Sequence, residues 1–195
     1  MNIIGKNSEF ELVEKKSKFI ARSFIVSSES EAMSVFEKVS SLFRDATHNV
    51  YAYRILENGI LKIKFSDAGE PKNTAGKPIV DLLSRLNLIN TLIVVTRYFG
   101  GIKLGAPGLL RAYLGSAKHV IDASAIEEYI PKYTVEISFG YNLISQIDNL
   151  LKARKHASVL DKNFTEDVNY KISADKETIA LLETQWGVKF RIANE

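Results

Sequence analysis

The chain of 195 residues contains no cysteine, which excludes disulfide bonds, thiolate nucleophiles and cysteine-ligated zinc. It also lacks any run of about 18 apolar residues, so no membrane-spanning helix is predicted. The first residues carry no signal-peptide core, and we therefore expect a cytoplasmic protein without a membrane partner. Only three histidines are present, and none has a second histidine or a cysteine nearby in the sequence. Neither a metal ion nor another cofactor is expected.

Acidic residues are missing from one long segment. No aspartate or glutamate lies between Asp81 and Asp122, whereas five basic residues do: Arg85, Arg97, Lys103, Arg111 and Lys118. The net charge of +3 arises in residues 1–129, because residues 130–195 hold nine basic and nine acidic side chains. A local positive field beside aromatic side chains fits a phosphate-bearing partner. The alternative is that acids from other segments neutralise this region in the folded chain.

Apolar periodicity is clear through most of the chain. Residues 10–27 alternate as two short strands, or as one strand with a break near Lys16. Ser28 and Glu31 form a capping box ahead of a helix. Asn58-Gly59 predicts a hairpin between two further strands. Helices are predicted to begin near Pro78 and Pro107, on either side of a strand over 91–98. The second of these helices has a predicted buried stripe of Leu110, Leu114, Ala117 and Ile121.

From about residue 130 the pattern changes to strand, helix, strand, strand, helix, strand, which is the ferredoxin-like order. No long linker or low-complexity segment separates this region from the preceding one. The sequence therefore predicts an α+β protein of two closely joined domains, residues 1–129 and residues 130–195.

The stretch "VVTRYFGGIKLGAPG" (94–108) runs from a predicted strand through a glycine-rich turn to a helix start. Free backbone N–H groups and the helix dipole favour anions at such a junction. It matches neither the Walker A motif nor the dinucleotide-binding fingerprint. We expect Arg97, Lys103 and Arg111 to contact phosphates and Tyr98 to stack on a base. The glycines, Gly100, Gly101 and Gly105, are expected to allow close approach of the ligand to the backbone. The alternative is that the glycines only let the loop turn tightly over the sheet.

A second loop, "SDAGEPKNTAGKP" (66–78), carries a candidate ligand site of Asp67, Glu70 and Lys72, with His48 at the start of a strand nearby. Two carboxylates at a strand end could hold Mg²⁺ or act as acid and base. The alternatives are turn chemistry, an ionic bridge from this loop to Arg97 or Lys103, and a structural histidine. No nucleophile–base pair accompanies the loop, so no catalytic residue is assigned.

The chain resembles the IMPACT family in its bacterial two-domain YigZ-type form. The resemblance rests on "EKKSKFIA" (14–21), "DATHNVYAYRI" (45–55), "SDAGEP" with "TAGKPI" (66–79), and "VVTRYFGGIKLG" with "GLLRAY" (94–113). Ala68 and Asn73 depart from the family pattern, which usually has an aspartate and a glycine there. The resemblance implies a first domain like the second domain of a small-subunit ribosomal protein, a fold shared with GHMP kinases. It implies a second domain like the ferredoxin-like domains of elongation factor G.

Eukaryotic members of the resembled family regulate translation initiation by interfering with activation of a starvation-responsive kinase. We therefore expect a non-enzymatic binding protein associated with RNA or the ribosome and acting in translation. One alternative is an enzyme or small-molecule binder for a phosphorylated ligand held between the 66–74 loop and the glycine-rich loop. The other is a protein-interaction module that binds a regulatory protein.

Overall fold

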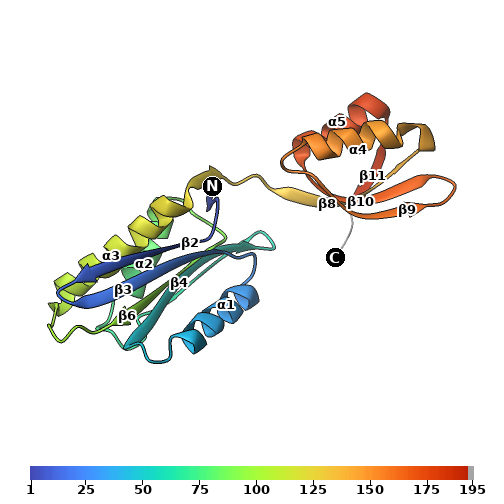
Figure 1. Ribbon diagram of the computed structural model, residues 1–195. Coiled ribbons are helices and arrows are strands. Elements are labelled where there is room, and N and C mark those ends of the chain that lie inside the picture. The colour runs from blue at the N-terminus through green and yellow to red at the C-terminus, as the bar shows by residue number, and fades with distance from the viewer. Residues whose placement is uncertain (193–195) are drawn as a thin grey trace. The chain divides into compact units, whose positions relative to one another are not determined.

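The computed structural model describes residues 1–192 as a mixed α/β protein with several sheets. The chain divides into two compact units, Met1–Tyr129 and Ile130–Glu195 (Figure 1). Each unit has its own hydrophobic core. Within the described residues no helix is long and apolar enough to cross a membrane.

The first unit is built on a five-stranded antiparallel sheet in the order β2-β3-β6-β4-β5. Its strands are β2 (Ser8–Glu14), β3 (Ser17–Ile25), β4 (His48–Glu57), β5 (Ile60–Ser66) and β6 (Thr91–Tyr98). The central strands β4 and β6 are buried on both faces because helices cover both sides of the sheet.

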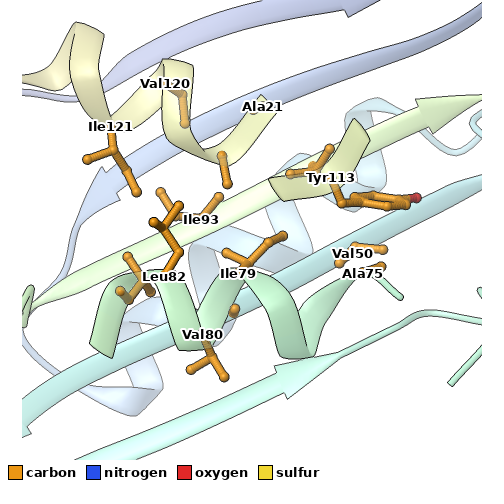
Figure 2. Close-up of a cluster of buried hydrophobic side chains, with 14 of the residues drawn as sticks. Ala21, Val50, Ala75, Ile79, Val80, Leu82, Ile93, Tyr113, Val120 and Ile121 are labelled. Carbon is orange, nitrogen blue, oxygen red and sulfur yellow. The ribbon is translucent and has the colours of Figure 1, made fainter. Parts of the chain in front are cut away.

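Helix α1 (Glu29–Leu42) packs on one face of the sheet, while α2 (Gly76–Arg85) and α3 (Gly105–Ser124) pack on the other (Figure 1). Figure 2 shows Ile93 of β6 between Ile79 and Leu82 of α2 and Val120 and Ile121 of α3. This core fixes the N-terminus of α3 relative to the sheet, and thereby places the glycine-rich loop that precedes it.

Several local predictions are confirmed. The Asn58-Gly59 hairpin joins β4 to β5 with positive φ at both residues. Ser28 caps α1 by accepting from the Glu31 amide, while the Glu31 carboxylate accepts from Ser27, one residue further back than in the standard box. The break near Lys16 is the turn between β2 and β3.

The helix starts near Pro78 and Pro107 are also confirmed, since α2 and α3 begin two residues before these prolines and hold them in the first turn. The predicted buried stripe of α3 is right in part. Ala117 and Ile121 are buried and Leu114 packs against the core, whereas Leu110 is exposed and Leu109 and Tyr113 are buried instead. The short strands β1 (Asn2–Ile4) and β7 (Ile126–Glu128) pair with each other. They were not predicted, because three residues are too few to show an alternation of apolar and polar side chains.

The second unit has the predicted order of elements, with four antiparallel strands arranged β11-β8-β10-β9. Its strands are β8 (Lys132–Phe139), β9 (Ser158–Phe164), β10 (Val168–Asp175) and β11 (Lys189–Ile192). A short 3-10 turn (Tyr141–Leu143) precedes α4 (Ile144–Ala153). This helix and α5 (Lys176–Trp186) cover one face of the sheet (Figure 1).

Candidate functional site

Three neighbouring strands bring Phe19, Arg97 and His48 into one row of the sheet. Arg97 on β6 lies opposite Phe19 on β3 and opposite His48 on β4. Side chains alternate between the two faces of a strand, so all three point to the side covered by α2 and α3. The Arg97 guanidinium carbon lies 5.4 Å from the ring centroid of Phe19. The predicted phosphate-binding arginine is therefore 6% exposed and lies beneath the helices.

Glu70 is the partner of this buried arginine. Arg97 Nη1 donates to Glu70 Oε1 at 2.6 Å, and Tyr113 Oη of α3 donates to the same oxygen at 2.7 Å. His48 Nε2 lies 3.9 Å from it. His48 Nδ1 lies 2.8 Å from the carbonyl oxygen of Ala68, and since a carbonyl only accepts, Nδ1 carries the proton. The ionic bridge from the 66–78 loop to Arg97, one of the alternatives from sequence, is present.

The cluster is closed to solvent and nearly balanced in charge. Burial, together with the Glu70 carboxylate beside it, raises the pKa of Tyr113 far above its ordinary value, so this phenol stays protonated. Arg97 Nε is buried without a hydrogen-bond partner among the described residues. A buried ion pair of this kind specifies geometry more than it adds net stability. The cluster therefore joins the 66–74 loop, the sheet and α3, and we do not assign Arg97 to a phosphate.

Tyr98 lies on the opposite face of the sheet from Arg97, because the two are consecutive residues of β6. Its hydroxyl donates to Asp45 Oδ1 at 3.1 Å and the side chain is half-buried. The expected pairing of a stacking ring with the neighbouring guanidinium therefore does not form. Phe99, just past the strand, is 47% exposed and has its ring centroid 5.6 Å from the guanidinium carbon of Arg97. Phe99, and not the predicted Tyr98, is therefore the more accessible ring at this position.

Asp67 is engaged by backbone groups at the start of α2. Its carboxylate accepts from the amides of Asn73, Ala75 and Gly76 at 2.8, 3.1 and 2.8 Å. Such an acid complements the helix dipole and satisfies amides that lack intrahelical partners. Asp67 is thus occupied as a capping group, while Lys72 of the same loop is exposed. Among the described residues, no group of three or more acidic or histidine side chains is placed to bind a metal ion.

The glycine-rich loop packs against the turn between β2 and β3. A Cβ on Gly100 would lie 2.0 Å from the backbone carbon and oxygen of Lys16, and the Gly100 amide donates to Ser17 Oγ at 3.2 Å. Gly101 has open space around it but a φ of +84°, where a side chain is strained. Gly105, with φ +69°, is the first residue of α3. The predicted tight turn is present, and the close approach at Gly100 is to protein backbone.

This contact gathers four exposed cations, which we call the cationic rim: Lys15, Lys16, Lys103 and Arg111. None has an ion-pair partner within residues 1–192. Lys15 and Arg111 line a shared hollow of about 200 Å³ with Leu104, Gly108 and one acid, Glu14. Lys103 lies in the loop itself, and Lys16 lies in the turn that touches Gly100. The sequence predicted Lys103 and Arg111; Lys15 and Lys16 join them only through tertiary contact.

Residues 15–121 match the family model described as the Impact N-terminal domain. The chain belongs to the IMPACT family. IMPACT family member YvyE of Bacillus subtilis is 38% identical over 181 residues, which is 92% of this chain and 82% of that protein. IMPACT family member YigZ of Escherichia coli is 31% identical over 138 residues, 70% of this chain and 68% of that protein.

A crystal structure described as that of a hypothetical protein covers 100% of this chain and 97% of its own, with a TM-score of 0.66 and 24% sequence identity. At that identity the likeness shows the fold alone. The IMPACT domain match lies inside the first unit, so the Glu70–Arg97–Tyr113 cluster and the cationic rim both belong to the part that the family model describes.

Proposed function

We propose that this IMPACT family member is a non-enzymatic cytoplasmic protein that binds RNA, on or off the ribosome, and thereby regulates translation. The observation that carries the proposal is the cationic rim around the glycine-rich loop. Its four side chains are exposed and have no ion-pair partner among the described residues. Two of them, Lys15 and Arg111, line one hollow beside the start of α3. Unpaired cations beside an exposed aromatic ring suit a sugar–phosphate backbone with accessible bases.

The loop adds backbone groups to these charges. Helix α3 has no acidic residue in its first turn and no side-chain cap, so its N-terminal dipole remains available to a phosphate. Phe99 supplies the stacking ring in place of Tyr98, and Lys15 and Lys16 take the place of Arg97 among the phosphate contacts. Lys103 and Arg111 keep the roles expected from sequence.

The sheet of the second unit supports no equivalent surface. The face away from its helices carries Arg191, Glu136, Lys171 and Asp161 in one row across the four strands. Arg191 bonds Glu136 at 2.8 Å, so opposite charges alternate and cancel. RNA-binding sheets of the RRM type instead present aromatic rings on this kind of face. The proposal therefore rests on the first unit.

The family resemblance extends the proposal to the folds. We propose that the first unit has the fold of the second domain of a small-subunit ribosomal protein, shared with GHMP kinases. We propose that the second unit, with its order β8-α4-β9-β10-α5-β11, has the fold of elongation factor G domains. Such folds are compatible with contacts to ribosomal RNA but do not specify them.

The test is RNA affinity measured against salt concentration for the wild type and for Lys15→Gln/Lys103→Gln/Arg111→Gln. At about 0.7 per phosphate contact with a single strand, the slope of log affinity against log salt should fall by about 2 in the triple variant. Lys6→Gln/Lys38→Gln/Lys118→Gln removes the same charge at exposed positions outside the rim and should leave the slope almost unchanged. No binding by the wild type, or equal slopes in the two triple variants, would contradict the proposal.

An enzyme or binder of a phosphorylated small molecule is less well supported. The groups that would serve as base or metal ligand, Asp67 and Glu70, are held by backbone amides and by Arg97 with Tyr113. His48 is oriented by Ala68 toward this buried carboxylate. The three side chains have structural partners, so a reaction would have to break the cluster. A thermal-shift screen with nucleotides and sugar phosphates, with and without Mg²⁺, tests this alternative directly.

A further inference from the structure

Strand β5 forms an open edge of the sheet in the first unit. It is seven residues long and pairs only with β4 among the described residues. An edge strand leaves every second pair of backbone N–H and C=O groups without a partner, and natural proteins usually protect such edges. Residues 60–66, "ILKIKFS", contain no proline and no acidic residue. The edge is therefore regular enough to accept another strand.

The two faces of β5 differ in chemistry. Leu61, Ile63 and Phe65 point to the side of α2, since Ile63 lies opposite Arg54, which donates to the carbonyl oxygens of Leu83 and Leu88 at the end of that helix. They remain 40%, 51% and 37% exposed. Lys62 and Lys64 point to the opposite face. The strand therefore offers exposed apolar groups on one face and two accessible lysines on the other.

We propose that β5 is a docking edge for an extended segment of another protein, which adds to the sheet as a sixth strand. The segment places apolar side chains beside Leu61, Ile63 and Phe65, and acidic side chains beside Lys62 and Lys64. Lys64 has no ion-pair partner within residues 1–192, and Lys62 has only a loose one, Glu29 at 3.8 Å. Backbone hydrogen bonds would supply affinity, and the alternating side chains would supply specificity.

Charge argues against a second copy of this chain as the occupant. An antiparallel β5–β5 pair centred on Ile63 sets Lys62 opposite Lys64 of the other copy, twice, and like charges directly opposite destabilise a sheet. A shift by one residue places lysines on the apolar face.

Strand β2 has the complementary acidic pattern at the other edge of the same sheet. Two of its three acids, however, already pair within their own sheet: Glu9 with Arg22 at 2.6 Å and Glu11 with Lys18 at 3.1 Å. Head-to-tail addition of β2 to β5 would also be a heterologous contact, which builds rings or filaments rather than a symmetric dimer. An acidic–apolar segment of a different protein meets none of these objections.

The experiment uses the full chain and a fluorescein-labelled peptide of alternating glutamate and valine. We expect saturable binding by fluorescence anisotropy and slower amide hydrogen exchange in residues 60–66. Lys62→Glu/Lys64→Glu should weaken binding about tenfold and should bind the matching lysine–valine peptide instead. Lys6→Glu/Lys118→Glu makes the same change in net charge near β2 and α3 and should retain the wild-type preference. A peptide N-methylated at alternate residues keeps the side chains but loses the ladder bonds, and should not bind.

Three results would overturn the proposal. The first is no preference for the alternating peptide over a scrambled peptide of the same composition. The second is equal binding of the N-methylated peptide, because simple charge attraction would then explain the signal. The third is reversible self-association of the wild type, measured by sedimentation, that Lys62→Glu/Lys64→Glu abolishes, since the occupant would then be a second copy. The outcome is independent of the RNA proposal, because the charge reversal leaves the cationic rim intact.

Discussion

Glu70 and Arg97 hold opposite charges in a space almost closed to water, with side chains only 3% and 7% exposed. Loss of one charge from such a pair leaves the other buried and uncompensated. Tyr113 adds a second donor to Glu70, and the rings of Phe19 and Phe99 flank the guanidinium. The energetic consequence of a change here is therefore much larger than at an exposed pair of the same residue types.

Glu70→Gln is expected to lower the free energy of unfolding by about 3–5 kcal/mol, because Arg97 keeps its charge without a counter-charge. Urea denaturation of the purified protein measures the loss. Glu37→Gln, at an exposed position of α1, should change stability by less than about 0.5 kcal/mol. The double variant Glu70→Gln/Arg97→Gln should be less destabilised than the sum of the single changes; simple additivity would refute the role of the pair.

The raised pKa of Tyr113 predicts that the protein loses stability in alkali. Burial and Glu70 raise its pKa in the folded state above the ordinary value of 10.0. Above about pH 10 the unfolded chain therefore loses this proton while the folded chain keeps it, and the free energy of unfolding falls by up to about 1.4 kcal/mol per pH unit. Below that pH the contribution is fully present. Tyr113→Phe removes this titration, so its stability should fall less steeply than that of the wild type between about pH 9 and pH 11. Parallel curves from urea denaturation would contradict this assignment.

At the scale of elements, the glycine-rich loop is shaped by its contact with the β2–β3 turn. The same contact that excludes a side chain at Gly100 brings Lys16 beside the loop that carries Lys103. The helix that follows is fixed by its core contacts with α2 and the sheet (Figure 2). The rim is thus a property of three elements together, and a shift of the loop would disperse it.

Gly100→Ala and Gly101→Ala separate the two reasons for glycine in this loop. Gly100→Ala forces backbone apart at Lys16 and should cost at least about 3 kcal/mol of stability or displace the loop. Gly101→Ala meets open space and should cost only about 1 kcal/mol, the price of a positive φ. Thermal denaturation ranks the two variants, and RNA affinity should follow the same order. A larger loss for Gly101→Ala would show that the contact at Lys16 is not what holds the loop.

At the scale of the whole molecule, the two units have separate cores, and the first is closed by its own N-terminus. Strand β1 pairs with β7, and the Tyr129 amide donates to the carbonyl oxygen of Met1 at 2.9 Å. Both ends of residues 1–129 are therefore tied together ahead of the second unit. The chain can be cut after Tyr129 without removing a strand from any of the three sheets.

We expect fragments 1–129 and 130–195 to fold separately, each with a cooperative urea transition. Removal of residues 1–7 from the first fragment should destabilise it, because β1 would be lost and β7 left unpaired. The measurements are circular dichroism and dispersion of amide NMR signals. RNA binding and peptide binding should both remain with fragment 1–129. A first fragment that lacks a cooperative transition would show that its stability depends on the second unit.

Local sequence determined most of the elements. Alternation, the Asn58-Gly59 turn and the Ser28 cap each act over a few residues, so they can be read without the fold. The order of elements in the second unit followed from the same signals. The starts of α2 and α3 followed from Pro78 and Pro107, because Pro is tolerated in the first helical turn; it does not fix which residue is the first.

Tertiary structure decided what the candidate residues do. The glycines, Lys103 and Arg111 could be found from sequence because they lie together in one loop and helix start. Pairing between strands determined that Arg97 faces Glu70, and alternation along β6 sent Tyr98 to the other face. Lys15 and Lys16 belong to the rim although their turn lies more than eighty residues before the glycine-rich loop in the sequence. They lie there because the turn packs against Gly100, a contact that no local sequence pattern predicts. Sequence by itself determines which side chains are available, whereas only the packing of distant segments decides which charges are neutralised and which remain exposed.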